Sequence, residues 1–330
     1  MALKGFDAEF ADLPDYIVRI TARIWEGRGV GLIRRWYAPD CVVHTGMGPL
    51  AGAEAMVAGT FDTLNAFPDR RLLPEDIIWS GDDGIYLSSH RVLAPARHDG
   101  PGAFGPPTGR ELTFRAIADC TCTGNRIVEE WLVRDQAGIV RQIGLDPQTF
   151  AESLARADLY AGEAPWHLGP ARALREAGQF RPPVHQGHPA ARLVRDTMGA
   201  IWQGDLDVVR AAYHEACSVH APGARTLHGH DRLERFLFGY LAAFPDARLV
   251  IEHSIARDDP GLPARAATRW WLTGTHTGHG AFGPPTGAVV LVLGITHSVV
   301  VHSRIHEEWV LVDEVGLRNQ IAMQTRPTGD

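Results

Sequence analysis

The chain has 330 residues, of which 45% are hydrophobic and 22% charged, and its formal net charge is −7 at pH 7. This is the composition of a globular protein, and the length indicates about two domains. Acidic and basic residues are mixed without a basic stripe, so we expect no nucleic-acid partner. The longest apolar run, which begins at Ala288, is too short to cross a bilayer, and the N-terminal residues lack the pattern of a signal peptide. We therefore expect a cytoplasmic protein with no membrane partner.

The cysteines, Cys41, Cys120, Cys122 and Cys217, show no spacing typical of a zinc site. Cys120 and Cys122 stand two apart in a strand-like run, so they share a face, and we expect reduced thiols. The sequence contains no Gly-rich dinucleotide motif, nucleophile elbow or carboxylate–histidine cluster. We therefore predict neither a metal site nor a cofactor.

The first half of the chain opens with helical patterns. Apolar residues recur at helical spacing from Tyr16 to Trp25, and residues 32–37 continue as a second short helix. We predict a short strand over residues 41–44. A third helix is predicted over 53–67, where Pro68 ends it.

Alternating patterns typical of strands follow the third helix, over residues 71–80, 85–93, 111–123 and 127–135. Helices followed by a run of antiparallel strands predict an α+β domain. A curved antiparallel sheet wrapped over about three helices leaves a concave interior, which suits a small-molecule site.

The second half of the chain repeats the first. Residues 103–109 (AFGPPTG) recur as 281–287, and Ile127-Val-Glu-Glu-Trp131 recurs as Ile305-His-Glu-Glu-Trp309, both at an offset of 178 residues. Three further blocks recur in the same order at offsets of 176 or 177, so the chain carries two copies of one domain. We predict copy one over 1–155, a linker rich in Pro and Gly over 156–189, and copy two over 190–330.

The order of these blocks resembles that of the SnoaL-like polyketide cyclase family, of the nuclear-transport-factor-2-like superfamily. The residues that carry the resemblance are 274–278 (GTHTG), 282–287 (FGPPTG), 124–131 (GNRIVEEW) with Asp135 after it, and the histidine that follows the second helix. The family includes enzymes that close a ring by intramolecular aldol condensation. The resemblance implies two tandem cone-shaped domains. It also implies an intramolecular pseudo-dimer, because relatives commonly dimerise, while assembly into a homo-oligomer stays open.

Asp119 is the first catalytic candidate, because it lies in an otherwise apolar strand. A carboxylate there is costly to bury unless it is paired or protonated, and desolvation would raise its pKa toward the range of a general acid or base. The resemblance implies that an aspartate at this position moves a proton from the carbon that becomes the nucleophile. The alternative is a structural Asp bonded to Arg115 or to backbone. Copy two has His297 at this position, either as a base or as the mark of lost activity.

Two histidine positions recur in both copies: His44 aligns with His220, and His98 aligns with His276. We predict that His44 and His98 position the substrate or its developing oxyanion, and that His220 and His276 face a ligand. The alternative is a structural role that both copies share.

The other predicted substrate-binding residues are a Glu and a Trp on one strand face and an Arg on the neighbouring strand. Such a Trp can wall an apolar ligand, and the Glu or Arg can orient a polar group; the alternative is a core Trp beside an Arg–Glu ion pair. The candidates are Glu129, Trp131 and Arg91 in copy one, and Glu307, Trp309 and Arg269 in copy two.

Together these features favour a cofactor-independent enzyme of the cyclase or isomerase type that acts on a small, apolar carbonyl compound. Asp119 would be its acid/base. Two alternatives stay open: a non-catalytic protein that binds a small apolar ligand, and a protein-association module. Copy two has His297 at the position that Asp119 occupies in copy one, and this difference favours the binding alternative for copy two.

Overall fold

The computed structural model describes residues 3–325, and the chain divides into two compact units, Met1–Leu145 and Asp146–Asp330. The first unit begins with helices that the sequence specifies locally. In α1 (Leu13–Thr21) the Asp12 side chain caps the N-terminus, and the buried residues Leu13, Tyr16, Ile17 and Ile20 form one apolar stripe. The other elements are a π-helical turn (Ala22–Glu26), a 3-10 turn (Val30–Leu32), α2 (Ile33–Trp36), β1 (Tyr37–Thr45), β2 (Gly48–Ala51), α3 (Gly52–Ala66), β3 (Leu73–Asp82), β4 (Ile85–Arg97), β5 (Glu111–Thr123), β6 (Arg126–Arg134) and α4 (Gln136–Gln142).

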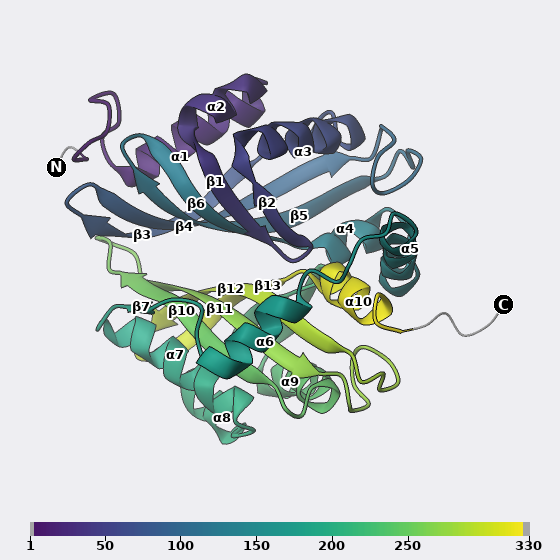
Figure 1. Cartoon of the computed structure of the whole chain (residues 1–330). Coiled ribbons are helices and arrows are strands. Elements are labelled where there is room, and N and C mark those ends of the chain that lie inside the picture. The colour runs from purple at the N-terminus through teal and green to yellow at the C-terminus, as the bar shows by residue number, and fades with distance from the viewer. Residues whose placement is uncertain (1–2, 326–330) are drawn as a thin grey trace. The chain divides into compact units, whose positions relative to one another are not determined.

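The first sheet has the strand order β2-β1-β6-β5-β4-β3, and α1, α2 and α3 lie on one side of it (Figure 1). The consecutive strands β3 to β6 pair antiparallel, as predicted, but β1 pairs parallel to β6. The sheet is therefore mixed rather than wholly antiparallel. The two strands are far apart in the sequence: β1 comes before α3, and β6 is the last strand of the unit. They are not joined by a hairpin, so nothing requires them to run antiparallel.

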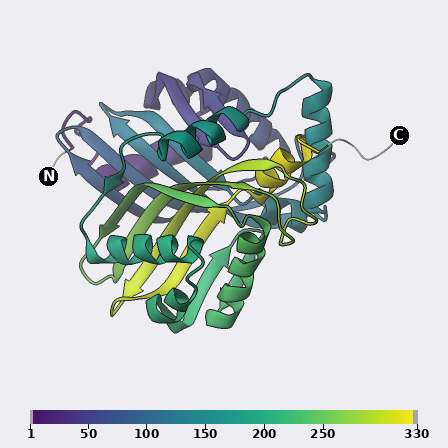
Figure 2. The same ribbon diagram turned by 60° about the horizontal axis from the view of Figure 1, so that its bottom comes forward.

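The second unit repeats this plan and adds elements before it. Its sheet has the order β7-β10-β11-β12-β13-β8-β9, with α7 lying across the helix-facing side of the green and yellow strands (Figure 2). The elements are α5 (Pro147–Tyr160), α6 (Leu168–Ala177), β7 (Val184–His185), α7 (Pro189–Trp202), α8 (Asp207–Ala212), β8 (Tyr213–Ala221), β9 (Arg225–His228), α9 (His230–Ala243), β10 (Arg248–Arg257), β11 (Ala264–Thr275), β12 (Val289–Val301), β13 (Arg304–Val312) and α10 (Glu314–Ala322).

The segment predicted as a linker, 156–189, is built into the second unit. It contains the end of α5, all of α6, and β7, which adds a parallel strand beside β10. His167, with 0% of its surface exposed, bonds through Nε2 to the Val289 carbonyl at 3.1 Å. The first compact unit ends at Leu145 in the sequence, whereas the repeat predicts copy one to 155 and copy two from 190. The Pro and Gly content of this segment gives no sign of these long-range contacts.

Candidate functional site

The two faces of β5 have different surroundings, and this decides where Asp119 lies. The even-numbered residues of the strand, among them Phe114, Ala118 and Cys120, belong to the hydrophobic clusters beneath the helices. Because side chains alternate along a strand, Asp119 lies on the opposite face, away from the helices. It is 1% exposed, and its neighbours across the sheet are Ser89 and Trp131. The helix-facing space, which we call the cone interior, therefore does not receive the Asp119 side chain.

His44, Glu129 and Trp131 gather on the same outward face as Asp119. His44 Nε2 lies 2.8 Å from Glu129 Oε1, and the imidazole stacks on Trp131 with ring centroids 5.1 Å apart and an interplanar angle of 16°. The register pairs Trp131 with both His44 and Asp119, so four of the predicted site residues form one cluster outside the cone interior.

Copy two reproduces this cluster. His220 Nε2 lies 3.1 Å from Glu307, and the imidazole stacks on Trp309 at the same 5.1 Å and 16°. His297 stands opposite Trp309, as Asp119 stands opposite Trp131. The shared geometry explains why these positions recur: His and Trp brace β1 against β6, and β8 against β13.

The two predicted arginines are held in ion pairs on the same outward face. Arg91 Nε contacts Glu75 at 2.9 Å, and Arg115 shares that carboxylate at 2.9 Å. Arg269 Nε lies 3.5 Å from Glu252, which also accepts a hydrogen bond from Trp271 Nε1 at 3.1 Å. Both arginines are thus engaged structurally.

His98 and His276 hold the repeated FGPPTG turn in place. His98 Nδ1 lies 3.2 Å from Thr108 Oγ1, and its ring packs on Phe67 at 5.4 Å. His276 makes the equivalent contact with Thr286 at 3.1 Å. Burial lowers the pKa of both histidines, so they are neutral at pH 7. Their buried Nε2 atoms have no hydrogen-bond partner among residues 3–325.

A cavity of about 180 Å³ opens into the cone interior of copy one, between α1 and the strands β3 and β4. His90 is its one histidine; it faces inward, because it pairs across the sheet with the inward-facing Ala118. Burial lowers the pKa of His90 to about 4, so the imidazole is neutral at pH 7, and the Asp119 charge opposes this shift. Its buried Nδ1 has no hydrogen-bond partner in the described part of the chain. The lining residues are Ile17, Val18, Thr21, Ala22, Glu26, Arg71, Leu72, Leu73, Pro74, Ile77, His90 and Val92.

Arg70 precedes the lining residue Arg71 in the chain and is 5% exposed. Burial lowers the pKa of its guanidinium to about 9; Arg134 and Arg28 lower it further, and Glu26, a cavity-lining residue, opposes the shift. Nε and Nη2 of Arg70 are buried without a hydrogen-bond partner in the structure from 3 to 325. Glu26 meanwhile accepts hydrogen bonds from the Leu72 amide at 2.6 Å and from Arg71 Nε at 3.2 Å.

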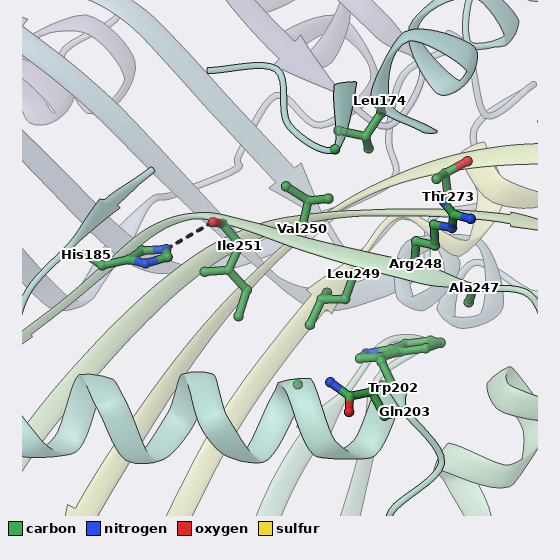
Figure 3. A pocket seen from close by; sticks show the side chains of 12 residues that line it. Leu174, His185, Trp202, Gln203, Ala247, Arg248, Leu249, Val250, Ile251 and Thr273 are labelled. Atoms are coloured by element: carbon green, nitrogen blue, oxygen red, sulfur yellow. Dashed lines mark hydrogen bonds between the residues drawn. The ribbon is translucent and has the colours of Figure 1, made fainter. Parts of the chain in front are cut away.

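Copy two has a larger cavity, of about 480 Å³, at the equivalent place (Figure 3). Gln203 and Arg248 line it at an offset of 177 residues from Glu26 and Arg71. Leu174 of α6 and His185 of β7 add a wall, and His185 Nε2 is bonded to the Ile251 carbonyl at 3.0 Å. The full lining is Leu174, Gly178, His185, Gly199, Trp202, Gln203, Ala247, Arg248, Leu249, Val250, Ile251 and Thr273.

Two polar groups of the first cone interior, Arg70 and His90, are replaced in the second. Ala247 stands at the position of Arg70, at an offset of 177, and Thr268 stands at that of His90, at 178. Trp270 fills space against Gly294, where an added Cβ would lie 2.1 Å from the indole ring. The two interiors therefore offer different chemistry.

One buried acid in each cone interior was missed from the sequence. Tyr37 donates a hydrogen bond to Glu130 at 2.8 Å, and Tyr213 donates to Glu308 at 2.8 Å. Burial raises the pKa of both carboxyls to about 7. The repeated Glu-Glu-Trp motif contains both glutamates. The sequence did not show which glutamate of each pair points into the cone interior. Arg70 and His90 occur in one copy only, so the repeat could not point to them.

Within residues 3–325, no group of three or more His, Cys, Asp or Glu side chains could hold a metal ion. Over the same residues, no helix is both long and apolar enough to span a membrane.

Comparison with known proteins gives one family match. The sequence model of the SnoaL-like polyketide cyclases matches residues 15–143 and 192–321. Among solved structures, one from Jannaschia sp. CCS1, provisionally described as a SnoaL-like polyketide cyclase, is 19% identical to this chain. The match covers 44% of this chain and 97% of that chain, with a TM-score of 0.37. IdmH of Streptomyces antibioticus, also provisionally described as a polyketide cyclase, is 22% identical over 41% of this chain and 99% of that chain, with a TM-score of 0.36. A search of curated proteins found no match.

Proposed function

The chain belongs to the SnoaL-like polyketide cyclase family, with one copy in each half, and from this we propose that copy one is a cofactor-independent acid/base enzyme of the cyclase or isomerase type. Its substrate would be a small carbonyl compound. The observation that carries the proposal is His90, a neutral imidazole with an unpartnered nitrogen that lines an otherwise largely apolar cavity.

The cavity volume fits the reacting part of a small molecule. About 180 Å³ is below the 300–1,000 Å³ typical of sites for drug-sized ligands. It is close to the volume of about 150 Å³ that accommodates benzene in an engineered protein cavity. Aliphatic side chains from α1, β3 and β4 would exclude water from the bound carbonyl group.

His90 would move the proton. The neutral imidazole takes a proton from the carbon next to a carbonyl, and the C–H electron pair becomes the enolate. In a cyclisation, the enolate carbon forms a bond to a second carbonyl carbon of the same molecule, and the resulting alkoxide takes the proton back from His90. In an isomerisation, the proton returns to a different carbon. The enolate charge raises the pKa of the nearby imidazole, which strengthens a base whose resting pKa is about 4.

This proposal moves the acid/base role from Asp119 to His90. Asp119 and His44 lie on the outward face of the sheet, and His98 is tied to the FGPPTG turn. Asp119 would act only through its charge, which raises the pKa of His90.

The test is deuterium exchange at the carbon next to the carbonyl of small aryl methyl ketones, followed by NMR in deuterated buffer. The parent protein should accelerate exchange. His90→Asn should reduce this acceleration by roughly 10²–10⁴-fold, as is typical for a positioned base, whereas Asp119→Asn should keep the rate within a few-fold. Exchange at the buffer rate for the whole ketone series would count against the proposal. Loss on Asp119→Asn with no loss on His90→Asn would return the role to Asp119.

A second function, non-catalytic ligand binding, is favoured for copy two. Its cavity of about 480 Å³ lies within the range typical of small-molecule sites and is lined by Trp202 and several aliphatic residues (Figure 3). Thr268 stands where copy one has His90. Native mass spectrometry of the purified chain should reveal a small ligand whose occupancy falls on Trp202→Ala and persists on His90→Asn. The opposite pattern would assign the ligand to copy one.

A further inference from the structure

A buried guanidinium that forms no ion pair with any residue from 3 to 325 marks the cone interior of copy one. Arg70 is 5% exposed, and its Nε and Nη2 lack acceptors among the described residues. Removing a charge from water costs several kcal/mol unless a partner compensates it. The site therefore holds donors that are oriented but unused by the protein.

The surroundings of Arg70 are positively charged. Arg28 and Arg134 both act on it with like charge, and among the described residues the acidic group that acts on its pKa is Glu26. The Glu26 carboxylate is already engaged by the Leu72 amide and by Arg71. A further anion would thus meet a net positive field and free hydrogen-bond donors.

The repeat shows which space Arg70 adjoins. Its counterpart in copy two, Ala247, lines the 480 Å³ cavity, and Glu26, which interacts with Arg70, lines the 180 Å³ cavity of copy one. Because both cavities occupy the same place in the fold, Arg70 stands at the edge of the first one. Copy two has lost the charge at this position together with His90.

We propose that Arg70 binds the carboxylate of an acidic ligand whose apolar body occupies the copy-one cavity. The planar guanidinium can donate two parallel hydrogen bonds to a carboxylate. This inference deepens the proposed function, on which it rests for the reaction: the substrate class becomes a small aromatic or alicyclic keto acid, with the ring near His90. Binding itself requires no turnover.

Benzoate is a suitable probe, because a ring of benzene size fits the volume. Benzamide keeps the shape without the charge. Isothermal titration calorimetry on the full chain should show saturable binding of benzoate that is at least ten-fold tighter than that of benzamide. Arg70→Met should weaken benzoate binding at least ten-fold. Arg34→Met, which removes an arginine paired with Glu54 on the surface, should leave it unchanged.

A second readout separates binding from a structural role. Because Nε and Nη2 of Arg70 are buried without an acceptor in the described part of the chain, Arg70→Met should unfold at the same temperature as the ligand-free parent or higher. Benzoate should raise the unfolding temperature of the parent and not that of the variant.

Three results would overturn the proposal: no saturable benzoate binding, equal affinities for benzoate and benzamide, or parent-like benzoate affinity in Arg70→Met. A large drop in the unfolding temperature of ligand-free Arg70→Met would also overturn it, by showing that the charge stabilises the fold. If benzoate binds as expected but the protein does not accelerate deuterium exchange, the acid/base function is refuted. The proposal that Arg70 binds a carboxylate is then still supported.

Discussion

Replacement of Glu130 by glutamine should flatten the pH dependence of the stability of copy one. The native carboxyl is buried against Tyr37, and burial raises its pKa from 4.5 to about 7. In the unfolded chain it ionises near its ordinary value. Between these two pH values the native state binds the proton and the unfolded state does not, so stability falls as pH rises.

The size of the effect follows from the two pKa values. Each pH unit between them is worth about 1.4 kcal/mol, so the carboxyl costs copy one about 3 kcal/mol of stability at pH 8 relative to pH 4.5. Glutamine cannot ionise, and its carbonyl can still accept the Tyr37 hydroxyl hydrogen. Its buried amide group adds a cost of about 1–3 kcal/mol, but that cost is the same at every pH. Glu308→Gln should act in the same way on copy two, whose carboxyl has a pKa of about 7.

Urea denaturation followed by circular dichroism at pH 4.5, 6, 7 and 8 measures the effect. The quantity of interest is the stability of Glu130→Gln minus that of the parent at each pH. Histidines with lowered pKa values, such as His90 and His167, titrate equally in both proteins and cancel. The difference should rise by about 3 kcal/mol from pH 4.5 to pH 8. A difference that stays constant across this range would refute the assignment of a near-neutral pKa to Glu130.

Glycine substitutions test the packing of the two copies. Gly100→Ala and Gly278→Ala should each destabilise its own copy by about 1–3 kcal/mol in chemical denaturation, because the new Cβ would lie 1.8 Å from the carbonyl oxygen of Asn65 or of Ala242. Equal stability of variant and parent would show that the backbone relaxes freely there. Gly59→Ala in α3 should instead stabilise copy one by about 0.5–1 kcal/mol, because no atom lies within 4 Å of its added Cβ and alanine favours the helix; a loss of stability would contradict this.

The amino-acid sequence by itself determined that the chain holds two copies of an α+β domain of one family. The repeated blocks carry this information without reference to contacts, and the family match over 15–143 and 192–321 agrees with it. The order of helices and strands was also predictable, because periodicity and caps such as Asp12 act within a few residues. The segment 156–189 was harder, because α6 and β7 are held by contacts with residues about 70 to 120 positions away.

Only the tertiary structure decided which face of each strand is the interior. On β5, the alternation separates a mostly polar set, which includes Arg115 and Asp119, from an apolar set, which includes Cys120, but Asp119 is buried as well. A period of two identifies two faces and does not say which one the helices cover. That choice depends on packing between elements far apart in the sequence. It places Asp119 outward and His90 inward, and it buries Arg70, from a loop, where the charge of the cavity-lining Glu26 acts on it.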